Sequence, residues 1–299
     1  MNETTIAFIG LGAMGSHSAR LLATAGFRVQ GFDLRQEALL ALSEAGGHPC
    51  SSAAEAARGA ARAVLFVVNG KQAQDVIFGP GGLGETAADG MTILSCVTMS
   101  PNEAADIGMR CRERGWKFVD APVSGGTAGA KRGALTIMAA GKPDAIEDCR
   151  PICEVIGQRY MVVGSEAGQG AMVKTINQLL CGVHLAAAGE AMAMARRAGL
   201  DLQAVWNVVN QSAAASWMLN DRGPRMVAQD FDTPTSAIDI FVKDLGIVAD
   251  VARDLRFPAP LAATALQSFL GVSGAGKGRK DDAAVMQFYE GFSPPPRGG

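Results

Sequence analysis

Apolar residues follow two different patterns along this chain, and the change between them falls near residue 164. Before it, short apolar runs alternate with longer segments in which apolar residues recur every three or four positions. The runs are TIAFIG, RVQGFDL, AVLFVV, MTILSCVT, WKFVDAPV, ALTIMAAG and RYMVVG. Continuous apolar runs of this kind are typical of strands that are buried on both faces of a parallel sheet. The pattern predicts a Rossmann-type, doubly wound α/β domain over residues 1–164.

Beyond residue 164 the helical period is the only one that persists. One long helix is predicted near residues 168–199, and shorter helical segments follow it at 202–212, 235–255, 259–271 and 281–290. The sequence therefore predicts an all-α domain over residues 165–292, which the long helix joins to the first domain. This second domain is expected to serve substrate binding and oligomerisation. The final SPPPRGG, residues 293–299, is predicted to be disordered.

A glycine-rich turn connects the first apolar run to the first helical segment. It consists of Gly10, Leu11, Gly12, Ala13, Met14 and Gly15. In a G-x-G-x-x-G turn the first glycine permits the tight bend, the second lets a pyrophosphate approach the backbone, and the third lets helix and strand pack closely. The phosphates would lie at the helix N-terminus, where free N–H groups favour anions. The alternative is a glycine turn that binds no ligand.

An acidic residue follows the second apolar run at the position that a dinucleotide site requires. Asp33 lies 18 positions after Gly15. A carboxylate there binds the ribose 2′-hydroxyl of NAD and repels the 2′-phosphate of NADP, so the sequence predicts NAD as cofactor. Arg35 leaves the strictness of that choice open, because an arginine can hold a 2′-phosphate.

A polar patch interrupts the apolar long helix in VKTINQLL. Lys174, Asn177 and Gln178 stand at positions i, i+3 and i+4, which share one face of a helix. Burying a charged amine costs several kcal/mol unless it is compensated. Lys174 therefore either reaches water or has a chemical role, and a lysine with a lowered pKa can act as a general acid/base.

Together with the glycine fingerprint, four segments resemble the β-hydroxyacid dehydrogenase family, the relatives of 3-hydroxyisobutyrate dehydrogenase. They are DAPVSGG at 120–126, GQG at 168–170 followed by Lys174, KDL at 243–245, and CVTMSP around Thr98. The resemblance covers almost the whole chain. It implies an NAD-dependent oxidoreductase with a small hydroxy acid as substrate, and a homodimer or homotetramer as the assembly.

The resemblance also implies roles for individual residues. Lys174 corresponds to the catalytic lysine of the family, which takes a proton from the hydroxyl in oxidation and returns it in reduction. Ser124, Gly125 and Gly126 are expected to bind the substrate, because a hydroxyl and backbone N–H groups can hold a carboxylate. Thr98 and Lys243 are expected near the nicotinamide.

Two positions depart from the family pattern. Val97 stands where the family usually has serine, which removes one polar contact. Gln178 stands where the family usually has asparagine, and with Asn177 it is expected to bind a substrate oxygen. Lysine, glutamine and the following QLLxGVHxAAAxEAM resemble the branch that oxidises L-threonate, a four-carbon sugar acid, to a 2-oxo acid. The rivals are 3-hydroxyisobutyrate dehydrogenase, tartronate semialdehyde reductase and, in another class, a non-catalytic NAD-binding regulator.

Composition and charge narrow the remaining classes of function. The net charge of −2 offers no electrostatic basis for binding nucleic acid or an anionic membrane surface. The six cysteines show no CxxC spacing and histidines number three, so no metal site is predicted. Buried free thiols are expected instead. A signal-like start and an uninterrupted apolar run of about 20 residues are both missing, so we expect a cytoplasmic protein.

Overall fold

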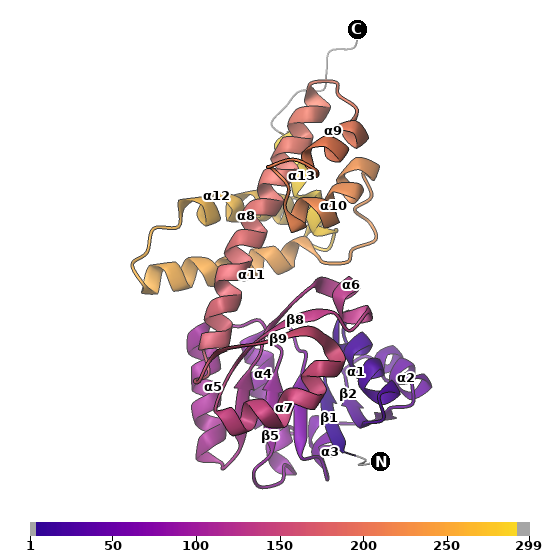
Figure 1. The fold of residues 1–299 in the computed structure, drawn as a ribbon, viewed down its shortest axis with the longest axis vertical. Helices are drawn as coiled ribbons and strands as arrows, with labels where there is room; N and C mark the ends of the chain where they lie inside the picture. The colour runs from indigo at the N-terminus through magenta and orange to yellow at the C-terminus, as the bar shows by residue number, and fades with distance from the viewer. Residues whose placement is uncertain (1–3, 292–299) are drawn as a thin grey trace. The chain divides into compact units, whose positions relative to one another are not determined.

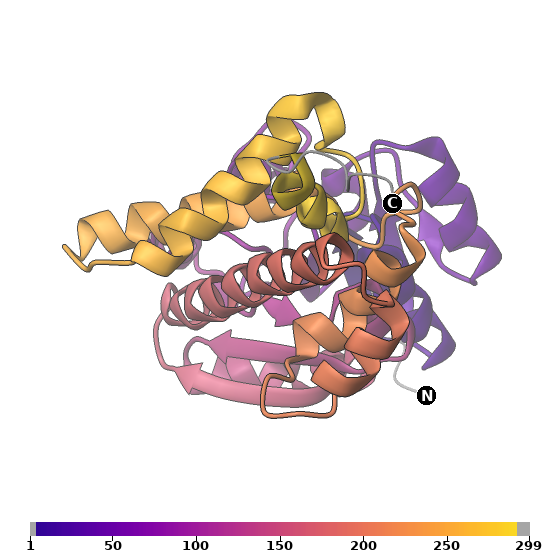
Figure 2. The same ribbon diagram turned by 90° about the horizontal axis from the view of Figure 1, so that it is seen from above.

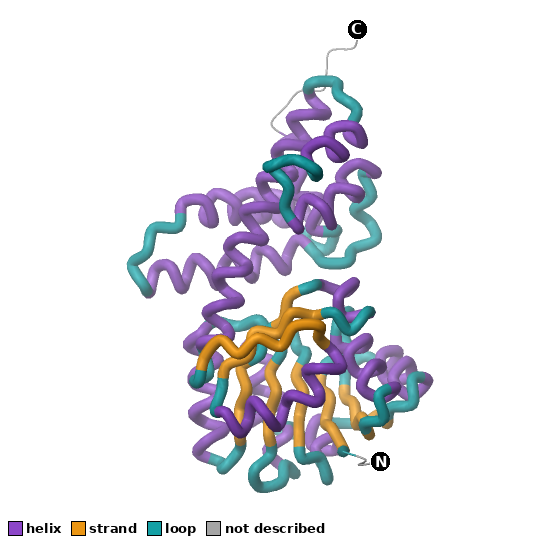
Figure 3. The backbone as a smooth tube through the Cα atoms, viewed as in Figure 1, coloured by secondary structure: helices purple, strands orange, loops and turns teal. Residues whose placement is uncertain are grey.

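The computed structural model describes residues 4–291, and the predicted disordered tail at 293–299 lies outside them. The chain divides into two compact units, Met1–Lys174 and Thr175–Gly299. Within the described residues every strand lies in the first unit, as the orange segments of Figure 3 show. The first unit is an α/β domain and the second is helical, which confirms the predicted fold class.

The first unit is built on one nine-stranded sheet with the order β3-β2-β1-β4-β5-β6-β8-β7, and β9 pairs with β8. The strands from β1 to β6 are all parallel. Their order is that of a doubly wound nucleotide-binding sheet. The bounds are β1 Thr5–Ile9, β2 Arg28–Phe32, β3 His48–Pro49, β4 Arg62–Leu65, β5 Thr92–Ser95, β6 Lys117–Asp120, β7 Val123–Ser124, β8 Leu135–Ala140 and β9 Gly157–Gly164.

The sheet is not parallel throughout, which the sequence pattern did not predict. Strand β8 runs antiparallel to β6 and β7 and parallel to β9. The run WKFVDAPV, predicted as one strand, is divided into β6 and β7. The division falls at Ala121 and Pro122, and a proline has no N–H to give to a strand ladder. The break starts a new direction for the chain directly before Ser124.

Helices cover both faces of this sheet (Figure 1). Those of the first unit are α1 Gly15–Thr24, α2 Gln36–Glu44, α3 Ala53–Ala57, α4 Gly70–Phe78, α5 Pro101–Glu113, α6 Gly126–Lys131 and α7 Pro143–Ile156, with a 3₁₀ turn η1 at Leu83–Glu85. Side chains of β1 alternate between two apolar cores. Ile6 and Phe8 pack with α1, α2 and α7, whereas Ala7 and Ile9 pack with α3, α4 and α5. This double burial explains the continuous apolar runs of the sequence.

The described helices of the second unit pack around an apolar core of their own. They are α8 Gln169–Arg197, whose first turns belong to the first unit, α9 Leu202–Val209, α10 Trp217–Ala228, α11 Ile238–Asp254, α12 Pro260–Val272 and α13 Met286–Gly291. Two short turns, the π turn η2 Ser273–Lys277 and the 3₁₀ turn η3 Asp282–Val285, lie between α12 and α13. Helices α11 and α12 pack side by side (Figure 2). A stacked pair, Phe241 with Phe269, joins them at 4.9 Å between ring centroids.

Helix α10 was missing from the sequence prediction, because Gly223 and Pro224 interrupt its pattern. Glycine is required there, since a Cβ at Gly223 would lie 2.2 Å from the indole Nε1 of Trp206. That indole N–H donates to the carbonyl of Leu219 at 3.2 Å. The Ser216 hydroxyl caps the helix by accepting from the Leu219 amide at 3.1 Å.

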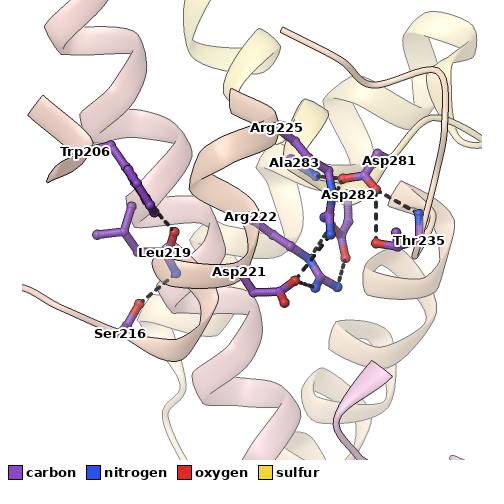
Figure 4. A network of polar contacts seen from close by, with 10 residues as sticks. All are labelled: Trp206, Ser216, Leu219, Asp221, Arg222, Arg225, Thr235, Asp281, Asp282 and Ala283. Carbon is purple, nitrogen blue, oxygen red and sulfur yellow. Dashed lines mark hydrogen bonds and ion pairs between the residues drawn. The ribbon is translucent and has the colours of Figure 1, made fainter. Parts of the chain in front are cut away.

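A network of buried charges holds α10 against the turn η3 (Figure 4). The Arg222 guanidinium donates to both carboxylate oxygens of Asp282, at 2.8 and 2.9 Å, and also to Asp221. Arg225 donates to Asp281 at 3.2 Å, and the other oxygen of Asp281 accepts from the Thr235 amide at 2.9 Å. Asp281 and Asp282 are fully buried, so their partners compensate for the loss of water.

Among residues 4–291, helix α8 is the one element that length and mean hydropathy alone would permit to cross a membrane. Half of its most apolar window is buried inside the protein, and the core helix of a soluble protein passes the same test. Lys174 and Gln178 lie on this helix and are both buried. Burial, rather than contact with lipid, is the simpler account of its apolar composition.

Candidate active site

The glycine turn has the geometry of a dinucleotide-binding loop. Gly10 has a φ of +95°, which lies in the left-handed region that glycine adopts without strain. A Cβ on Gly15 would lie 2.0 Å from the Gly10 carbonyl oxygen, so α1 approaches β1 as closely as only glycine allows. The space in front of Gly12 is open, with nothing within 4 Å of a Cβ built there.

Helix α1 presents its N-terminus at this loop. Its N-cap residue, Met14, makes no capping hydrogen bond from its side chain. The first-turn amides of a helix have no partner inside the helix. Open space before Gly12 and a start of α1 that the Met14 side chain does not cap therefore fit the pyrophosphate of a dinucleotide.

Asp33 is oriented by the same loop. Its Oδ2 accepts from the Leu11 amide at 2.7 Å, and its Oδ1 accepts from the amide and the Nε of Arg35 at 2.9 and 3.0 Å. Partial burial raises the pKa of Asp33, but the hydrogen bonds from Arg35 and Leu11 outweigh it and leave the pKa below its ordinary value. Asp33 is therefore an ionised carboxylate at the end of β2, as a ribose-binding acid requires.

A second acid, Asp120, holds the start of helix α8. Its Oδ2 accepts from the amides of Gly168 and Ala171, at 2.9 and 2.8 Å. Gly170 permits this approach, because a Cβ there would lie 2.5 Å from the Asp120 carbonyl oxygen. Gly168 turns the chain with a φ of +97°. The GQG segment is thus a backbone requirement for bringing α8 onto the end of β6.

Burial raises the pKa of Asp120 from 3.8 to about 6, and the amides that donate to it limit the rise. Its side chain is fully buried. The start of α8 is therefore anchored by a carboxyl group that titrates close to neutrality. Lys174 follows one turn later on this anchored helix, and only 7% of it is exposed.

The remaining predicted residues of the first unit lie on the carboxyl side of the sheet strands. Thr98 lies in the segment between β5 and α5, and it is partly buried. Ser124 ends β7, opposite Thr136 of β8. Gly125 and Gly126 follow with φ values of +128° and +61°, and the space before Gly126 is open. Their backbone adopts a conformation that residues with a side chain rarely reach.

In the second unit the structure brings three predicted residues together. Gln178 is buried and donates from Nε2 to the Asp244 carboxylate at 2.5 Å. The Asn177 side-chain amide donates to the Gln178 carbonyl oxygen at 2.9 Å and to the Cys181 sulfur at 3.4 Å. Lys243 lies 2.7 Å from the other oxygen of Asp244. Asp244 therefore connects the glutamine of α8 with the lysine of α11.

The comparisons with known proteins agree with this architecture. Residues 5–164 match the family model of the NAD binding domain of 6-phosphogluconate dehydrogenase. Residues 168–289 match the model for NAD-binding of NADP-dependent 3-hydroxyisobutyrate dehydrogenase. The chain belongs to the β-hydroxyacid dehydrogenase family. It is an oxidoreductase that uses NAD to act on a hydroxy acid, which confirms the predicted family, reaction class and cofactor.

Other members of the β-hydroxyacid dehydrogenase family match over nearly their full length. An L-threonate dehydrogenase of Cupriavidus necator is 43% identical over 290 residues, which is 97% of each chain. An L-threonate dehydrogenase of Escherichia coli is 41% identical over 295 residues, 98% of this chain and 97% of that one. The crystal structure of a 3-hydroxyisobutyrate dehydrogenase from Salmonella typhimurium has a TM-score of 0.89 and 40% identity, and covers 94% of this chain and 98% of that chain.

The sequence alone does not reveal three features of this β-hydroxyacid dehydrogenase. Asp120 and Asp244 stand inside recognisable motifs, but the anchoring contacts that they make span 48 and 66 positions. Arg35 suggests a phosphate ligand in the sequence, whereas the structure shows it as a partner of Asp33. The positive φ of Gly168 is a further feature, and this one has a local signal, since a glycine before a helix often marks a turn.

The site also explains one departure from the family pattern and settles the state of the thiols. Val97, in place of the usual serine, is fully buried in the core beside β5, so the missing polar contact is replaced by packing. The six cysteines are free, and all but Cys181 are buried, as predicted.

Proposed function

We propose that this protein oxidises a four-carbon sugar acid, with L-threonate as the first choice, and that Lys174 is the general acid/base. The observation that carries this proposal is a buried lysine on a helix that is anchored at its start by Asp120. Gln178 follows one helical turn later on the same face of α8. Burying a charged amine costs several kcal/mol unless it is compensated, so a buried lysine in this position favours a chemical role over a side chain that only reaches water.

The chemistry divides between the cofactor and the chain. NAD accepts the hydride from the carbinol carbon of the substrate. The hydroxyl oxygen must lose its proton in the same reaction, and Lys174 takes it. In the reverse direction Lys174 returns the proton. Gln178, fixed by Asn177 and Asp244, directs its remaining amide hydrogen and oxygen lone pair at a substrate hydroxyl.

We assign the substrate carboxylate to the turn after β7. Ser124 offers a hydroxyl, and Gly125 and Gly126, both with positive φ, offer backbone amides beside the open space at Gly126. Such amides bind an anion without adding a formal charge. Thr98 and Lys243 are assigned to the nicotinamide region, where Lys243, paired with Asp244, contributes a compensated positive charge.

The choice of L-threonate rests on two considerations. Two relatives at 41–43% identity are L-threonate dehydrogenases. The Gln178 side chain is one methylene longer than that of the usual asparagine, so its amide lies further from the helix backbone. This position suits a substrate with additional hydroxyls. 3-Hydroxyisobutyrate is one alternative substrate, because a solved structure at 40% identity is a 3-hydroxyisobutyrate dehydrogenase. Tartronate semialdehyde is the other alternative that the family resemblance suggests. A regulator that binds NAD without turnover is the alternative from another class.

The test is NAD reduction by the purified protein with a panel of hydroxy acids. The panel holds L-threonate, D-threonate, both erythronates, D-glycerate and 3-hydroxyisobutyrate. We expect the highest kcat/KM with L-threonate, and a loss of roughly 10²–10⁴-fold in Lys174→Ala. Lys71→Ala is the matched control, since Lys71 is an exposed helix lysine paired with Asp75. A higher kcat/KM with another acid would overturn the proposed substrate. A Lys174→Ala variant that keeps its activity would overturn the proposed role of Lys174 as general acid/base.

We further propose that the protein works in the cytoplasm as a homodimer or homotetramer. Apolar side chains are exposed on the helical unit, among them Ile176, Leu180, Met194, Phe257 and Leu261. Large apolar side chains that are exposed on one unit favour association between copies of the chain. Light scattering after size exclusion measures the assembly directly, and a monomer at micromolar concentration contradicts this proposal.

A further inference from the structure

Two buried polar atoms that the proposed mechanism does not use stand at the ends of neighbouring strands. One is the hydroxyl of Ser95, the last residue of β5, and the other is Oδ1 of Asp120, the last residue of β6. Both side chains are fully buried. Among residues 4–291, neither of these two atoms has a hydrogen-bond partner. A buried polar atom is costly unless it finds a partner, so this pair needs an explanation.

The strand register places the two side chains on the same side of the sheet. Ser95 pairs with Asp120 between β5 and β6. Side chains alternate between the two faces of a strand, so each residue shares its face with the residue two positions earlier. Those earlier residues, Ile93 and Phe118, pack in one core together with Ala171 of α8. Ser95 and Asp120 therefore lie side by side beneath the start of α8.

The two oxygens of Asp120 have different surroundings. Oδ2 accepts from the amides of Gly168 and Ala171 and so holds the first turn of α8. Oδ1 is left for a partner from the sheet. A serine hydroxyl can donate to a carboxylate and can also accept from a protonated acid, so it suits Asp120 in either state. Neighbouring strands are about 4.8 Å apart, and rotation of the serine side chain between its staggered positions brings the hydroxyl within reach.

We propose that Ser95 is a positioning residue for catalysis: its hydroxyl bonds Oδ1 of Asp120 and fixes the carboxyl group that sets the position of Lys174. Without this bond the carboxyl group is held only by the helix that it anchors. The first turn of α8 then gains freedom, and the Lys174 amine one turn later gains it as well. A misplacement of about 1 Å can lower a rate by about 10²-fold. This inference rests on the proposed role of Lys174 as general acid/base.

The experiment is a set of double-mutant cycles on the full chain. Ser95→Ala is made alone, together with Asp120→Ala, and together with Lys174→Ala. NAD reduction is measured for each variant with the best hydroxy acid of the panel, and thermal melts show whether each variant is folded. Ser18→Ala is the matched control, because Ser18 on α1 is fully buried and its hydroxyl also has no hydrogen-bond partner among the described residues.

We expect Ser95→Ala to lower kcat by about 3- to 30-fold, as for the loss of one hydrogen bond, and to leave the KM for NAD within about twofold. In the Asp120→Ala or Lys174→Ala background the same substitution should change kcat by less than about twofold, because the group through which Ser95 acts is already missing. Ser18→Ala should change neither constant. Ser95→Ala should also lower the melting temperature by about 2–4 °C in the wild type, and by less in Asp120→Ala.

Two results would overturn the proposal. One is a Ser95→Ala enzyme whose kcat stays within about twofold of wild type. The other is a loss of kcat that keeps its full size in the Lys174→Ala background, which would mean that Ser95 does not act through the lysine. Failure of the proposed function is a separate observation, because it would appear as activity of the Lys174→Ala single variant. The cycle of melting temperatures needs no substrate and tests the pair of Ser95 and Asp120 by itself.

Discussion

Gln178 on α8 and Asp244 on α11 are joined by a hydrogen bond of 2.5 Å, and both side chains are buried. Asp244 thereby fixes the orientation of the amide that distinguishes this chain from the asparagine usual in its family. Lys243 lies on the other oxygen of the same carboxylate. One acid thus orders two residues with proposed roles at the reaction centre.

Replacing Asp244 tests this arrangement. Asp244→Ala removes the acceptor of the buried Gln178 amide and one ion-pair partner of Lys243, so we expect the free energy of unfolding to fall by about 2–4 kcal/mol. Asp244→Asn retains one acceptor oxygen and should lose less than half of that. Urea titration followed by circular dichroism measures both. If the two variants are equally stable, the carboxylate does not order its neighbours.

The extra methylene of Gln178 should be visible in substrate preference. Gln178→Asn withdraws the amide from the substrate and from Asp244, so we expect kcat/KM for L-threonate to fall by roughly 10-fold or more. The value for 3-hydroxyisobutyrate should fall less or rise. Steady-state kinetics with both acids gives the ratio. An unchanged ratio would show that Gln178 has no part in substrate choice.

Substitutions at two glycines of the nucleotide loop should have different effects, one on NAD binding and the other on stability. A Cβ at Gly12 enters open space, so Gly12→Ala should keep the melting temperature and weaken NAD binding by at least about 10-fold. A Cβ at Gly15 would lie 2.0 Å from the Gly10 carbonyl, so Gly15→Ala should cost at least about 1–3 kcal/mol of stability. Calorimetric melts and NAD titrations of both variants check the contrast. The reverse outcome would mean that Gly12 is structural.

The titration of Asp120 predicts a particular dependence of stability on pH. Its pKa in the folded protein is about 6, above the value of 3.8 that it has when exposed. The folded state therefore favours the protonated acid, and stability from this group is present below about pH 4 and is lost as pH rises through about 6. The loss corresponds to about 2–4 kcal/mol.

Asp120→Asn removes this titration and keeps one oxygen for the amides of Gly168 and Ala171. The difference in unfolding free energy, variant minus wild type, should therefore increase by about 2–4 kcal/mol between pH 4 and pH 7. Asp120→Ala is the comparison, because it leaves the amides unpaired and should destabilise at every pH. A difference for Asp120→Asn that does not vary with pH would contradict the assigned titration.

The features predicted from the sequence are those with a local cause. Strands such as β1 were recognised because burial on both faces leaves a continuous apolar run, and the cofactor loop because Gly10 and Gly15 each meet a separate steric demand. Helix α10 was missed because Gly223 serves a distant contact with Trp206 rather than its own helix. The partners of Asp120 and Asp244 were missed for the same reason. Only the folded chain brings them together.

The buried pair of Arg222 and Asp282 has a consequence for the synthesis of the protein. The two residues are 60 positions apart, and helices α11 and α12 lie between them in the chain. A ribosome therefore finishes α10, which carries Asp221 as a first partner of Arg222, long before it makes Asp282, the fully buried partner. An arginine that lacks its buried partner stays in water, so the helical unit closes only after Asp282 has been made. Truncated chains that end before Asp282 should consequently be recognised as unfinished by proteases.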